Sequence, residues 1–313
     1  RCAVAVQCGG CQLQHQSALG QLTFKSNLLK SRLGRFIDTE SIHFLPMITN
    51  DRDWATRNKM QFAFSMGENG LEIGLYAARS HRVINFEYCH VMSKPMNDVL
   101  LAVKTWHRSD PVSVFNETTG DGILRHITLR YSYVTGQIML ILTVAQPFNM
   151  DSFLNILTSL NGMASIYISI QSNPSDDRVI GDELNHIWGA LMIDDVVYGS
   201  KCQVSPKSFM QANSMLVNRL YQLVINAIDA NDLVLDLYCG TGVMTCALAN
   251  YFDRVIGVDN NKMAIKDAQN NAVLNNVNVE FICKDVMVYL NDVEPQPMAV
   301  VLDPPRQGCS AEV

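Results

Sequence analysis

The chain has 313 residues, of which 48% are hydrophobic and 17% are charged, and its 30 acidic side chains outnumber its 24 Lys and Arg. This length predicts about two domains, and the composition is that of a folded globular protein, which excludes disordered, collagen-like and coiled-coil chains. A net charge of −6 excludes nucleic-acid binding by bulk positive charge alone, so such a role requires Lys and Arg gathered on one face.

The sequence shows neither a membrane segment nor a secretion signal. Its apolar runs stay shorter than the roughly 18 residues of a membrane-spanning helix. Residue 1 is Arg rather than Met, and no basic and apolar leader follows it. We expect a cytoplasmic monomer that makes no membrane contact.

Residues 1–200 predict an α+β domain rich in antiparallel strands. Apolar and basic residues over 17–36 are typical of an amphipathic helix, which could pack on the other domain. Period-two alternation from Met60 and the turn sequence Gly67–Gly70 predict a hairpin. The other predicted elements are a helix over 93–108, a helix over 151–160 capped by Asp151, and strands over 123–134, 138–145 and 164–171.

Residues 201–313 predict a parallel, doubly wound α/β sheet of the Rossmann-like type, because short buried strands alternate with helices. The predicted strands cover 233–237, 254–258, 279–283 and 299–302, and the predicted helices cover 205–228, 243–250 and 262–275. Four strands are fewer than such a sheet normally has, so we interpret the chain as trimmed at both ends, with the C-terminal domain incomplete.

Three of the nine cysteines stand within the first eleven residues, at Cys2, Cys8 and Cys11. Gly9 and Gly10 allow the backbone to curl so that the sulfurs converge. Thiolates at such short spacing suit zinc or an iron–sulfur cluster, and a disulfide scaffold is not expected in a chain of this length.

A fourth ligand is needed to complete such a site. Cys89 is the one other cysteine in the first 200 residues, although a buried, inert thiol is an ordinary alternative role for it. If the metal is zinc, His90 and His15 are rival ligands.

A glycine-rich turn follows the predicted strand over 233–237 and reads Asp-Leu-Tyr-Cys-Gly-Thr-Gly. Gly240 and Gly242 allow a ligand to approach the backbone and the N-terminus of the next helix. The dinucleotide fingerprint requires a third glycine where this chain has Thr245. The turn therefore fits S-adenosylmethionine as well as a nicotinamide dinucleotide.

Acidic residues stand at the carboxyl ends of the other predicted strands. Asp259 can accept hydrogen bonds from two ribose hydroxyls, or it can cap a helix. Asp285 is expected beside an adenine. Asp303 opens the stiff loop Asp-Pro-Pro-Arg-Gln-Gly, which can hold a carboxylate and carbonyls against a planar base, or can be an ordinary proline-rich turn.

Six segments together resemble the RNA uridine-carbon-5 methyltransferases, and they look most like the iron–sulfur branch that modifies ribosomal RNA. In chain order they are Cys-x5-CGGCQLQH, TRNKMQF, SPKSFMQAN, DLYCGTG, GVD and DPPRQG. They run from Cys2 to Gly308. The combination is specific, although each segment alone is not.

The resemblance implies a class I methyltransferase domain at 201–313, preceded by an iron–sulfur and RNA-binding domain at 1–200. It implies a 4Fe–4S cluster on Cys2, Cys8, Cys11 and Cys89. It implies S-adenosylmethionine bound by Gln211, Tyr238, Asp259 and Asp303 around Gly240 and Gly242, with Asp285 near the adenine. It places Arg57, Asn58 and Lys59 on the RNA side of the smaller domain, where the alternative is an ordinary exposed strand.

The resemblance also implies a covalent mechanism. A cysteine thiolate adds to carbon 6 of uracil, carbon 5 attacks the sulfonium methyl, and a base then removes the proton from carbon 5. In the family this cysteine lies in a Ser-Cys-Asn-Pro stretch and the base is a glutamate near the C-terminus. The chain ends at Val313 before either, so we expect it to be inactive alone, and Cys309 is a weak candidate nucleophile.

Two further departures from the family pattern matter. We do not expect in these residues the small β-barrel RNA-binding domain that usually precedes the cluster, and Val243 stands where an Asn or Thr that binds the cofactor is common. The RNA is expected to present a uridine rotated out of its stack, in ribosomal rather than transfer RNA. The alternatives are a catalytically inactive iron–sulfur RNA-binding protein and a nicotinamide oxidoreductase with a cluster, and Thr245 and the DPPR loop count against the latter.

Overall fold

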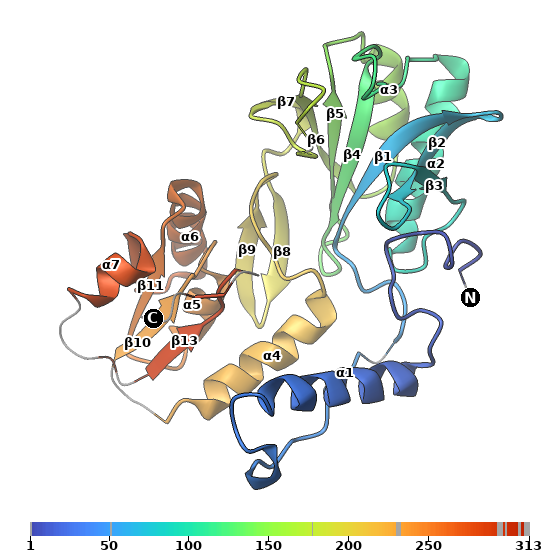
Figure 1. Ribbon diagram of the computed structural model, residues 1–313. Coiled ribbons are helices and arrows are strands. Elements are labelled where there is room, and N and C mark those ends of the chain that lie inside the picture. Colours follow the sequence, from blue (N-terminus) through green and yellow to red (C-terminus); the bar gives the residue numbers. More distant parts are fainter. Residues whose placement is uncertain are drawn as a thin grey trace. The chain divides into compact units, whose positions relative to one another are not determined.

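A computed structural model describes residues 2–50, 52–176, 178–229, 233–292, 297, 299–305, 308 and 309. The chain divides into two compact units, which are described separately below (Figure 1). Unit 1 comprises Arg1–Thr128, Leu142–Leu160 and Ser169–Glu183, and unit 2 comprises Leu129–Ile141, Asn161–Ile168 and Leu184–Val313. The sequence predicts a single boundary at residue 200, whereas each of these units is made of several separate segments. The predicted boundary therefore stays a prediction.

A seven-stranded sheet contributes residues to both units and has the strand order β3-β2-β1-β4-β5-β6-β7. Its strands are β1 Lys59–Gly67, β2 Gly70–Tyr76, β3 Val83–Asn85, β4 Leu124–Tyr131, β5 Ile138–Val144, β6 Met163–Ile170 and β7 Glu183–Gly189. The β1–β2 hairpin pairs antiparallel and turns between Gly67 and Gly70, as the alternation predicts. The α+β character and the antiparallel hairpin expected for this part of the chain are therefore present.

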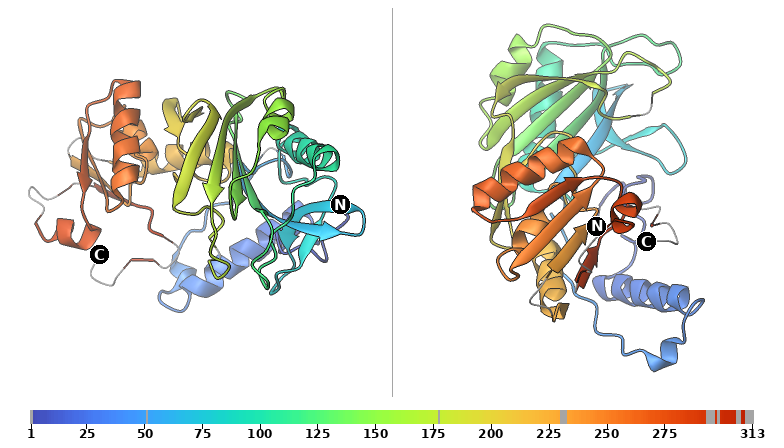
Figure 2. Two further views of the ribbon diagram at one scale, coloured as in Figure 1. Left: turned by 90° about the horizontal axis from the view of Figure 1, so that it is seen from above. Right: turned by 90° about the vertical axis from the view of Figure 1, so that its left-hand side faces the viewer.

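Helices α2 (Lys94–Ser109) and α3 (Asp151–Leu157) lie side by side in unit 1 (Figures 1 and 2). The Ser93 hydroxyl accepts from the Met96 N–H at the start of α2, which satisfies one of the orphan donors of the first turn. The fully buried Trp106 packs edge-on against Phe153, with 4.9 Å between ring centroids. This contact fastens the two helices together.

Helix α1 (Ala18–Leu33) begins where the sequence predicts, with the Ser17 hydroxyl accepting from the Gly20 N–H. It contains no buried residue, and Leu19 is 73% exposed. Its apolar side chains therefore do not form part of a described core. A short 3₁₀ helix, Thr39–Ser41, follows it.

Unit 2 contains the parallel sheet predicted for the C-terminal half. Strands β10 (Leu233–Leu237), β11 (Arg254–Asp259), β12 (Glu280–Cys283) and β13 (Ala299–Leu302) follow the order β12-β11-β10-β13. All pairings between them are parallel. The helices of this unit are α4 (Ser214–Ala227), α5 (Val243–Leu248), α6 (Lys262–Asn275) and α7 (Val286–Leu290), and a hairpin is formed by β8 (Ile193–Val197) and β9 (Ser200–Val204).

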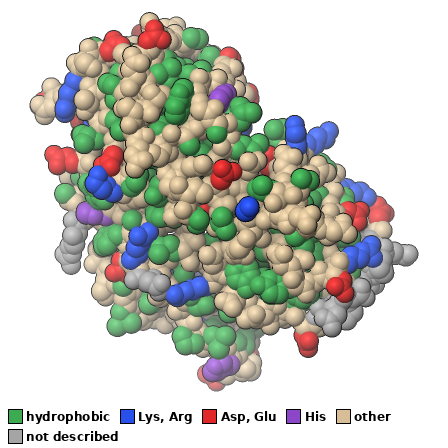
Figure 3. Space-filling model, turned by 180° about the vertical axis from the view of Figure 1, so that it is seen from behind, with side chains coloured by type: hydrophobic (Ala, Val, Ile, Leu, Met, Phe, Trp, Pro, Cys, Tyr) green, Lys and Arg blue, Asp and Glu red, His purple; other side chains and the backbone are tan. Residues whose placement is uncertain are grey.

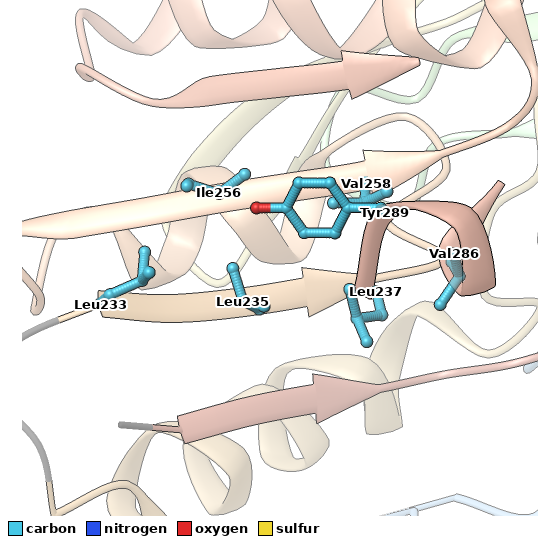
Figure 4. Packing of buried hydrophobic residues seen from close by; sticks show 7 residues of the cluster. All are labelled: Leu233, Leu235, Leu237, Ile256, Val258, Val286 and Tyr289. Atoms are coloured by element: carbon cyan, nitrogen blue, oxygen red, sulfur yellow. The ribbon is translucent and has the colours of Figure 1, made fainter. Parts of the chain in front are cut away.

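Both faces of this sheet are covered, which explains why its strands are continuously apolar. On one face, Leu233, Leu235 and Leu237 of β10 pack with Ile256 and Val258 of β11 beneath α7 (Figure 4). The residues that alternate with them, such as Val234 and Val255, pack on the opposite face with side chains of α4 and α5. The arrangement is the Rossmann-like α/β fold that the sequence predicts.

The helix predicted over 205–228 begins only at Ser214, so this prediction is wrong for its first nine residues. The buried guanidinium of Arg130 donates to the backbone carbonyls of Pro206 (3.1 Å) and Ser208. These carbonyls therefore accept hydrogen bonds from a side chain instead of from helical N–H groups. The helix begins after them, where the Asn213 side chain accepts from the N–H of Met215 and caps α4. The segment 205–213 is therefore a loop held from β4.

Two smaller differences have simple causes. Asp151 is the first residue of α3 and not its cap, since Met150 holds the cap position without a side-chain hydrogen bond. The sequence did not predict strands β3, β7, β8 and β9 or helix α7. The strand β7 is mostly exposed, and the β8–β9 hairpin alternates buried and partly exposed residues over only five residues each, which gives a weak periodic signal. Within the described residues, none of the helices has the length and apolar character needed to cross a bilayer.

Candidate functional site

A cavity of about 220 Å³ lies in unit 2 at the carboxyl ends of β10 and β13. This is where the strand order reverses direction, and ligands of doubly wound sheets bind at such switch points. Its lining includes four of the predicted cofactor-binding residues, Gln211, Tyr238, Gly240 and Asp303. Gly242, Asp259 and Asp285 are not among the described residues that line it.

The turn after β10 has left-handed backbone at Tyr238, Gly240 and Gly242, with φ values of 62°, 54° and 70°. The structure also leaves no space for a side chain at Gly242. A Cβ there would stand 2.6 Å from Cζ of Phe281 and 2.7 Å from Cβ of Ala268. The glycine thus lets the turn lie close to β12 and α6, and it begins α5.

Asp259 stands at the end of β11 and fixes the glycine-rich turn. Its Oδ2 accepts from the Gly240 N–H at 3.0 Å, and its Oδ1 accepts from the Asn261 N–H at 2.8 Å. Each carboxylate oxygen retains a second lone pair for a ligand hydroxyl. The alternative role as a helix cap is taken by Asn261, whose side chain accepts from Met263 and Ala264.

Thr245 stands where a dinucleotide fingerprint has glycine, and it binds a buried acid. Its hydroxyl donates to Oδ2 of Asp236 at 2.6 Å, and both residues are buried. Burial raises the pKa of Asp236 to about 7, and the charges of Asp303 and Asp259 act in the same direction, while the Thr245 hydrogen bond opposes them. Asp236 lines the cavity, and its carboxyl group changes charge near neutral pH.

Gln211 and Asp303 meet in the cavity wall. The Gln211 amide donates to Oδ2 of Asp303 at 2.8 Å, which joins the loop 205–213 to the end of β13. The sequence resemblance names Gln211 as a cofactor contact, but the helix predicted over 205–228 gave no sign of its bond to Asp303. Apolar side chains complete the wall, among them Phe209, Tyr221 and Val243, and the sequence alone did not indicate the first two.

Asp285 has a local structural role at the end of β12. It caps α7, and its Oδ1 accepts from the Met287 N–H at 3.0 Å. Cys309, the weak candidate nucleophile, is half-buried and contacts the Tyr238 hydroxyl. The pKa of Tyr238 is raised mainly by burial, and Cys309 raises it as well. Arg306 and Gln307 of the proline-rich loop and the terminal Val313 lie outside the described residues.

The four cysteines predicted to hold a cluster, Cys2, Cys8, Cys11 and Cys89, are free thiols in unit 1 and are all half-buried. Burial, helped by the other three cysteines and opposed by a backbone hydrogen bond at Val91, raises the pKa of Cys89 to about 11. Burial, Cys8 and Cys2 also raise the pKa of Cys11, while Arg57 lowers it. Among the described residues, however, no group of three or more His, Cys, Asp or Glu side chains is arranged to hold a metal ion.

The three predicted RNA-contacting residues lie just before and in β1. Arg57 is exposed, Lys59 is half-buried, and Asn58 is buried at 4% exposure. On the molecular face drawn in Figure 3, Lys and Arg form several small, separate groups.

Comparison with known proteins adds an independent line of evidence. A family model described as tRNA (uracil-5-)-methyltransferase matches residues 155–286. A protein of Clostridium acetobutylicum named as an RNA methyltransferase is 33% identical over 98% of this chain and 69% of its own length. A similarly named protein of Clostridium tetani is 34% identical over 98% of this chain and 68% of its own length.

A solved structure is similar over nearly the whole chain. It is the crystal structure of Pyrococcus abyssi tRNA (uracil-54, C5)-methyltransferase in complex with S-adenosyl-L-homocysteine. The TM-score is 0.81 at 26% identity, and the match covers 98% of this chain and 72% of that one.

Proposed function

This chain belongs to the RNA uracil-5-methyltransferase family, and we propose on this basis that it transfers a methyl group from S-adenosylmethionine to carbon 5 of a uridine in RNA. The observation that carries the proposal is the cavity at the switch point of the parallel sheet, where Gln211 and Asp303 are hydrogen-bonded to each other. The similar Pyrococcus abyssi structure contains the demethylated donor, which supports a donor site in the same fold.

The donor is proposed to lie across the carboxyl ends of the strands. Asp259 accepts hydrogen bonds from the ribose hydroxyls with its remaining lone pairs, because the backbone N–H groups of Gly240 and Asn261 hold it in place. Asp285 lies near the adenine, and Tyr238 and Gly242 shape the turn beneath the donor. The carboxylates of Asp303 and Asp236 face a sulfonium, whose positive charge they stabilise.

Mutation of the loop contact tests this assignment. Gln211→Ala removes the amide that binds Asp303, and Asp303→Asn removes its charge. We expect each to weaken S-adenosylmethionine binding by roughly tenfold, which is the loss of about one charge-assisted hydrogen bond. Calorimetry with the demethylated product as the second ligand measures this. Asp253→Asn, an exposed carboxylate in unit 2, is the control and should bind as the wild type does.

The chemistry is proposed to be covalent, as the resemblance implies. A thiolate adds to carbon 6 of uracil to give an enolate, and carbon 5 attacks the methyl group while the thioether leaves. A base then takes the proton from carbon 5, and the thiolate is eliminated from carbon 6. The Ser-Cys-Asn-Pro stretch that holds the nucleophile in the family does not occur in these 313 residues, so none of the described residues is assigned as nucleophile or base.

The target is proposed to be ribosomal RNA, because the cysteine segment at the N-terminus resembles the iron–sulfur branch of the family. Transfer RNA is the second candidate. It is favoured by the name of the matching family model and by that of the similar Pyrococcus abyssi enzyme. In either RNA, Arg57 and Lys59 are proposed to contact phosphates, and Asn58 to position the strand that carries them.

Cys2, Cys8, Cys11 and Cys89 are proposed to hold a 4Fe–4S cluster in unit 1. The donor set suits such a cluster, and the effect of Cys2, Cys8 and Cys11 on the pKa of Cys89 supports the proposal that the four lie near one another. When bound, the cluster supplies a covalent cross-link between the N-terminal loop and the segment before α2. Gly9 donates from its backbone N–H to the Tyr76 carbonyl at 3.0 Å, so this loop already lies on the end of β2.

The test of the proposed function uses the product of the complete reading frame. Ribosomal RNA and transfer RNA that lack 5-methyluridine are incubated with the protein and S-adenosylmethionine, and nucleosides are then measured by mass spectrometry. We expect 5-methyluridine in ribosomal RNA, and roughly tenfold slower formation with the Asp303→Asn variant when the donor is below saturation. Methylation of transfer RNA alone would correct the target, and no methylation of either RNA would refute the activity.

A further inference from the structure

Unit 1 contains a second cavity, of about 340 Å³, for which the methyl-transfer reaction gives no role. It lies against one end of the strands β1, β2 and β4 and the segment 114–117. Its volume falls within the range of about 300–1,000 Å³ that is usual for small-ligand sites. Aromatic and polar side chains line it together, a combination that fits a flat, polar-edged ligand.

The apolar side of this cavity is rigid. Phe115 is 8% exposed, and the Arg125 guanidinium stacks over its ring at 4.3 Å. Arg125 is 4% exposed, and its Nη1 donates to the carbonyls of Gln171 (2.7 Å) and Asn173 (2.8 Å). A buried guanidinium held in this way stays in place, and stacked planes of Arg and aromatic rings are typical surfaces for unstacked nucleobases.

The polar side is a chain of three hydrogen-bonded side chains. The Tyr76 hydroxyl donates to Oε1 of Glu117 at 3.3 Å, and the hydroxyl oxygen lies 3.4 Å from Nε2 of His126. Burial and the neighbouring Arg125 lower the pKa of His126 to about 4, so its ring is neutral at physiological pH. Because the Tyr76 hydroxyl donates its hydrogen to Glu117, the ring hydrogen of His126 is on Nε2, which donates to the Tyr76 oxygen. Nδ1 is then an acceptor, and it has no partner among the described residues.

Glu117 is the one carboxylate in the cavity lining, and it is held at both oxygens. His81 Nδ1 lies 2.7 Å from Oε2, while Tyr76 occupies one lone pair of Oε1. Each oxygen keeps a lone pair, so the carboxylate can accept two parallel hydrogen bonds. Guanine is the base that presents two adjacent donors on one edge, the ring N1–H and the exocyclic amino group.

We propose that this cavity binds an unpaired guanine of the RNA substrate, stacked beside Phe115 and recognised at its Watson–Crick edge by Glu117. This inference rests on the proposed function only for the statement that the guanine belongs to RNA. The loop that carries His81 also carries Arg79 and Arg82, both exposed, and their charges suit the phosphates on either side of an inserted nucleotide. A free guanine nucleotide has the same base but lacks this extended backbone.

The test measures equilibrium binding to the 313-residue chain, without any methyl transfer. The ligands are short fluorescent oligouridylates with one central guanosine, inosine, adenosine, cytidine or uridine, and guanosine monophosphate as a competitor. We expect guanosine to be preferred over the other standard bases by about tenfold, the discrimination typical of one bidentate pair. Inosine lacks the amino group and should bind with intermediate affinity. The free nucleotide should compete weakly.

Glu117→Gln is the decisive variant, because an amide presents a donor to the donors of guanine. It should abolish the preference for guanosine and leave uridine binding unchanged. Glu68→Gln, the same change at an exposed position of the β1–β2 turn, is the matched control and should keep the preference. Arg79→Ala should weaken binding of all the oligomers equally and reduce the salt dependence.

A wild-type protein without a preference for guanosine, or a Glu117→Gln variant that retains it, would overturn the proposal. Competition by free guanosine monophosphate as strong as that of the oligomer would show a nucleotide site instead of an RNA site. Calorimetric binding of S-adenosylhomocysteine by each variant shows that unit 2 is intact. Because no readout depends on methylation, failure of this proposal and failure of the proposed function are distinguishable.

Discussion

The pairing of Asp236 with Thr245 is the residue-scale feature that best connects sequence, folding and ligand binding. A carboxylate buried in a β-strand loses its hydration, and the 2.6 Å hydrogen bond from the Thr245 hydroxyl, together with one from the Thr245 backbone, compensates for part of this loss. The chain therefore retains a group near the donor site whose charge changes near neutral pH. A bound sulfonium would favour the ionised form.

This raised pKa predicts how stability depends on pH. The folded protein binds the Asp236 proton up to about pH 7 and the unfolded chain releases it near 3.8, so the contribution of this group to stability falls as pH rises between these values. Asp236→Asn has no such loss. We expect its stability relative to the wild type to rise by about 2–3 kcal/mol between about pH 5 and pH 8.

Urea unfolding at several pH values between about 5 and 8 measures this difference. Asp253→Asn, at an exposed position, is the control and should follow the wild-type pH dependence. An Asp236→Asn variant whose stability parallels that of the wild type across the range would mean that the carboxylate is not destabilised in the folded protein.

At the same scale, the sequence indicated most of the donor site but not the state of its residues. Gly240, Asp259 and Asp303 could be placed because they stand at strand ends, where the parallel topology gathers them. The substitution of Thr for glycine at position 245 was visible as a departure. The reason for this departure could not be predicted. Its partner Asp236 belongs to a strand that is otherwise apolar and buried, and a pair of residues inside a core leaves no periodic pattern in the sequence.

The glycine-rich turn shows at the element scale how a single missing side chain allows an element to pack. Gly242 combines a φ of 70° with a Cβ position only 2.6 Å from Phe281. Gly199, in the turn of the β8–β9 hairpin, has a similar φ of 78° but nothing within 4 Å of the same position. A side chain at Gly199 would therefore meet backbone strain alone, whereas a side chain at Gly242 would meet both backbone strain and a steric clash.

Alanine at each of these positions should therefore have different effects. Gly199→Ala should cost about 1 kcal/mol, the usual penalty of a left-handed conformation. Gly242→Ala should cost roughly 1–3 kcal/mol more, because it also displaces Phe281 from the sheet. Thermal or urea unfolding gives both values. Equal losses would show that Phe281 and α6 move aside without cost.

The loop 205–213 explains which elements could be predicted. Strands β10 and β13 match their predicted bounds because they are short apolar runs with clear ends, and helix α6 matches because it has helical periodicity. The segment from Ser205 also has helix-like periodicity. Arg130, which is distant in sequence, binds the Pro206 and Ser208 carbonyls and overrides it, and no local pattern could indicate that.

Arg130 consequently positions a part of the donor site without lining it. Lysine at this position has one charged nitrogen and cannot bind both carbonyls in the fork geometry of a guanidinium. We expect Arg130→Lys to weaken S-adenosylhomocysteine binding by about fivefold to tenfold, through a looser Gln211. Calorimetry measures this, and unchanged affinity in a folded variant would show that Gln211 is held by other contacts.

At the scale of the whole molecule, the order of elements follows from the sequence. The change from period-two to helical alternation near residue 200 predicts an α+β part followed by a parallel sheet, and both are present. The four cysteines lie in one unit, and Cys2 and Cys8 raise the pKa of both Cys11 and Cys89, but the thiols are not arranged as metal ligands in the described residues.

Metal content tests the cluster directly. After anaerobic reconstitution, the wild type should contain iron and acid-labile sulfide and should be brown. Cys11→Ser should lose the colour and become less soluble, because the N-terminal loop loses its cross-link to Cys89. Cys283→Ser, an exposed cysteine of unit 2, should retain the iron. A colourless wild type that contains zinc would contradict the 4Fe–4S assignment.

The central claim is that the carboxyl edge of the β12-β11-β10-β13 sheet binds the methyl donor. Titration calorimetry of the purified chain with S-adenosylhomocysteine and with NADH tests this most directly, with Asp259→Ala measured beside the wild type. We predict saturable binding of S-adenosylhomocysteine, strong weakening by Asp259→Ala, and no heat from NADH. Binding of NADH instead, or S-adenosylhomocysteine binding that is indifferent to Asp259→Ala, would contradict the account.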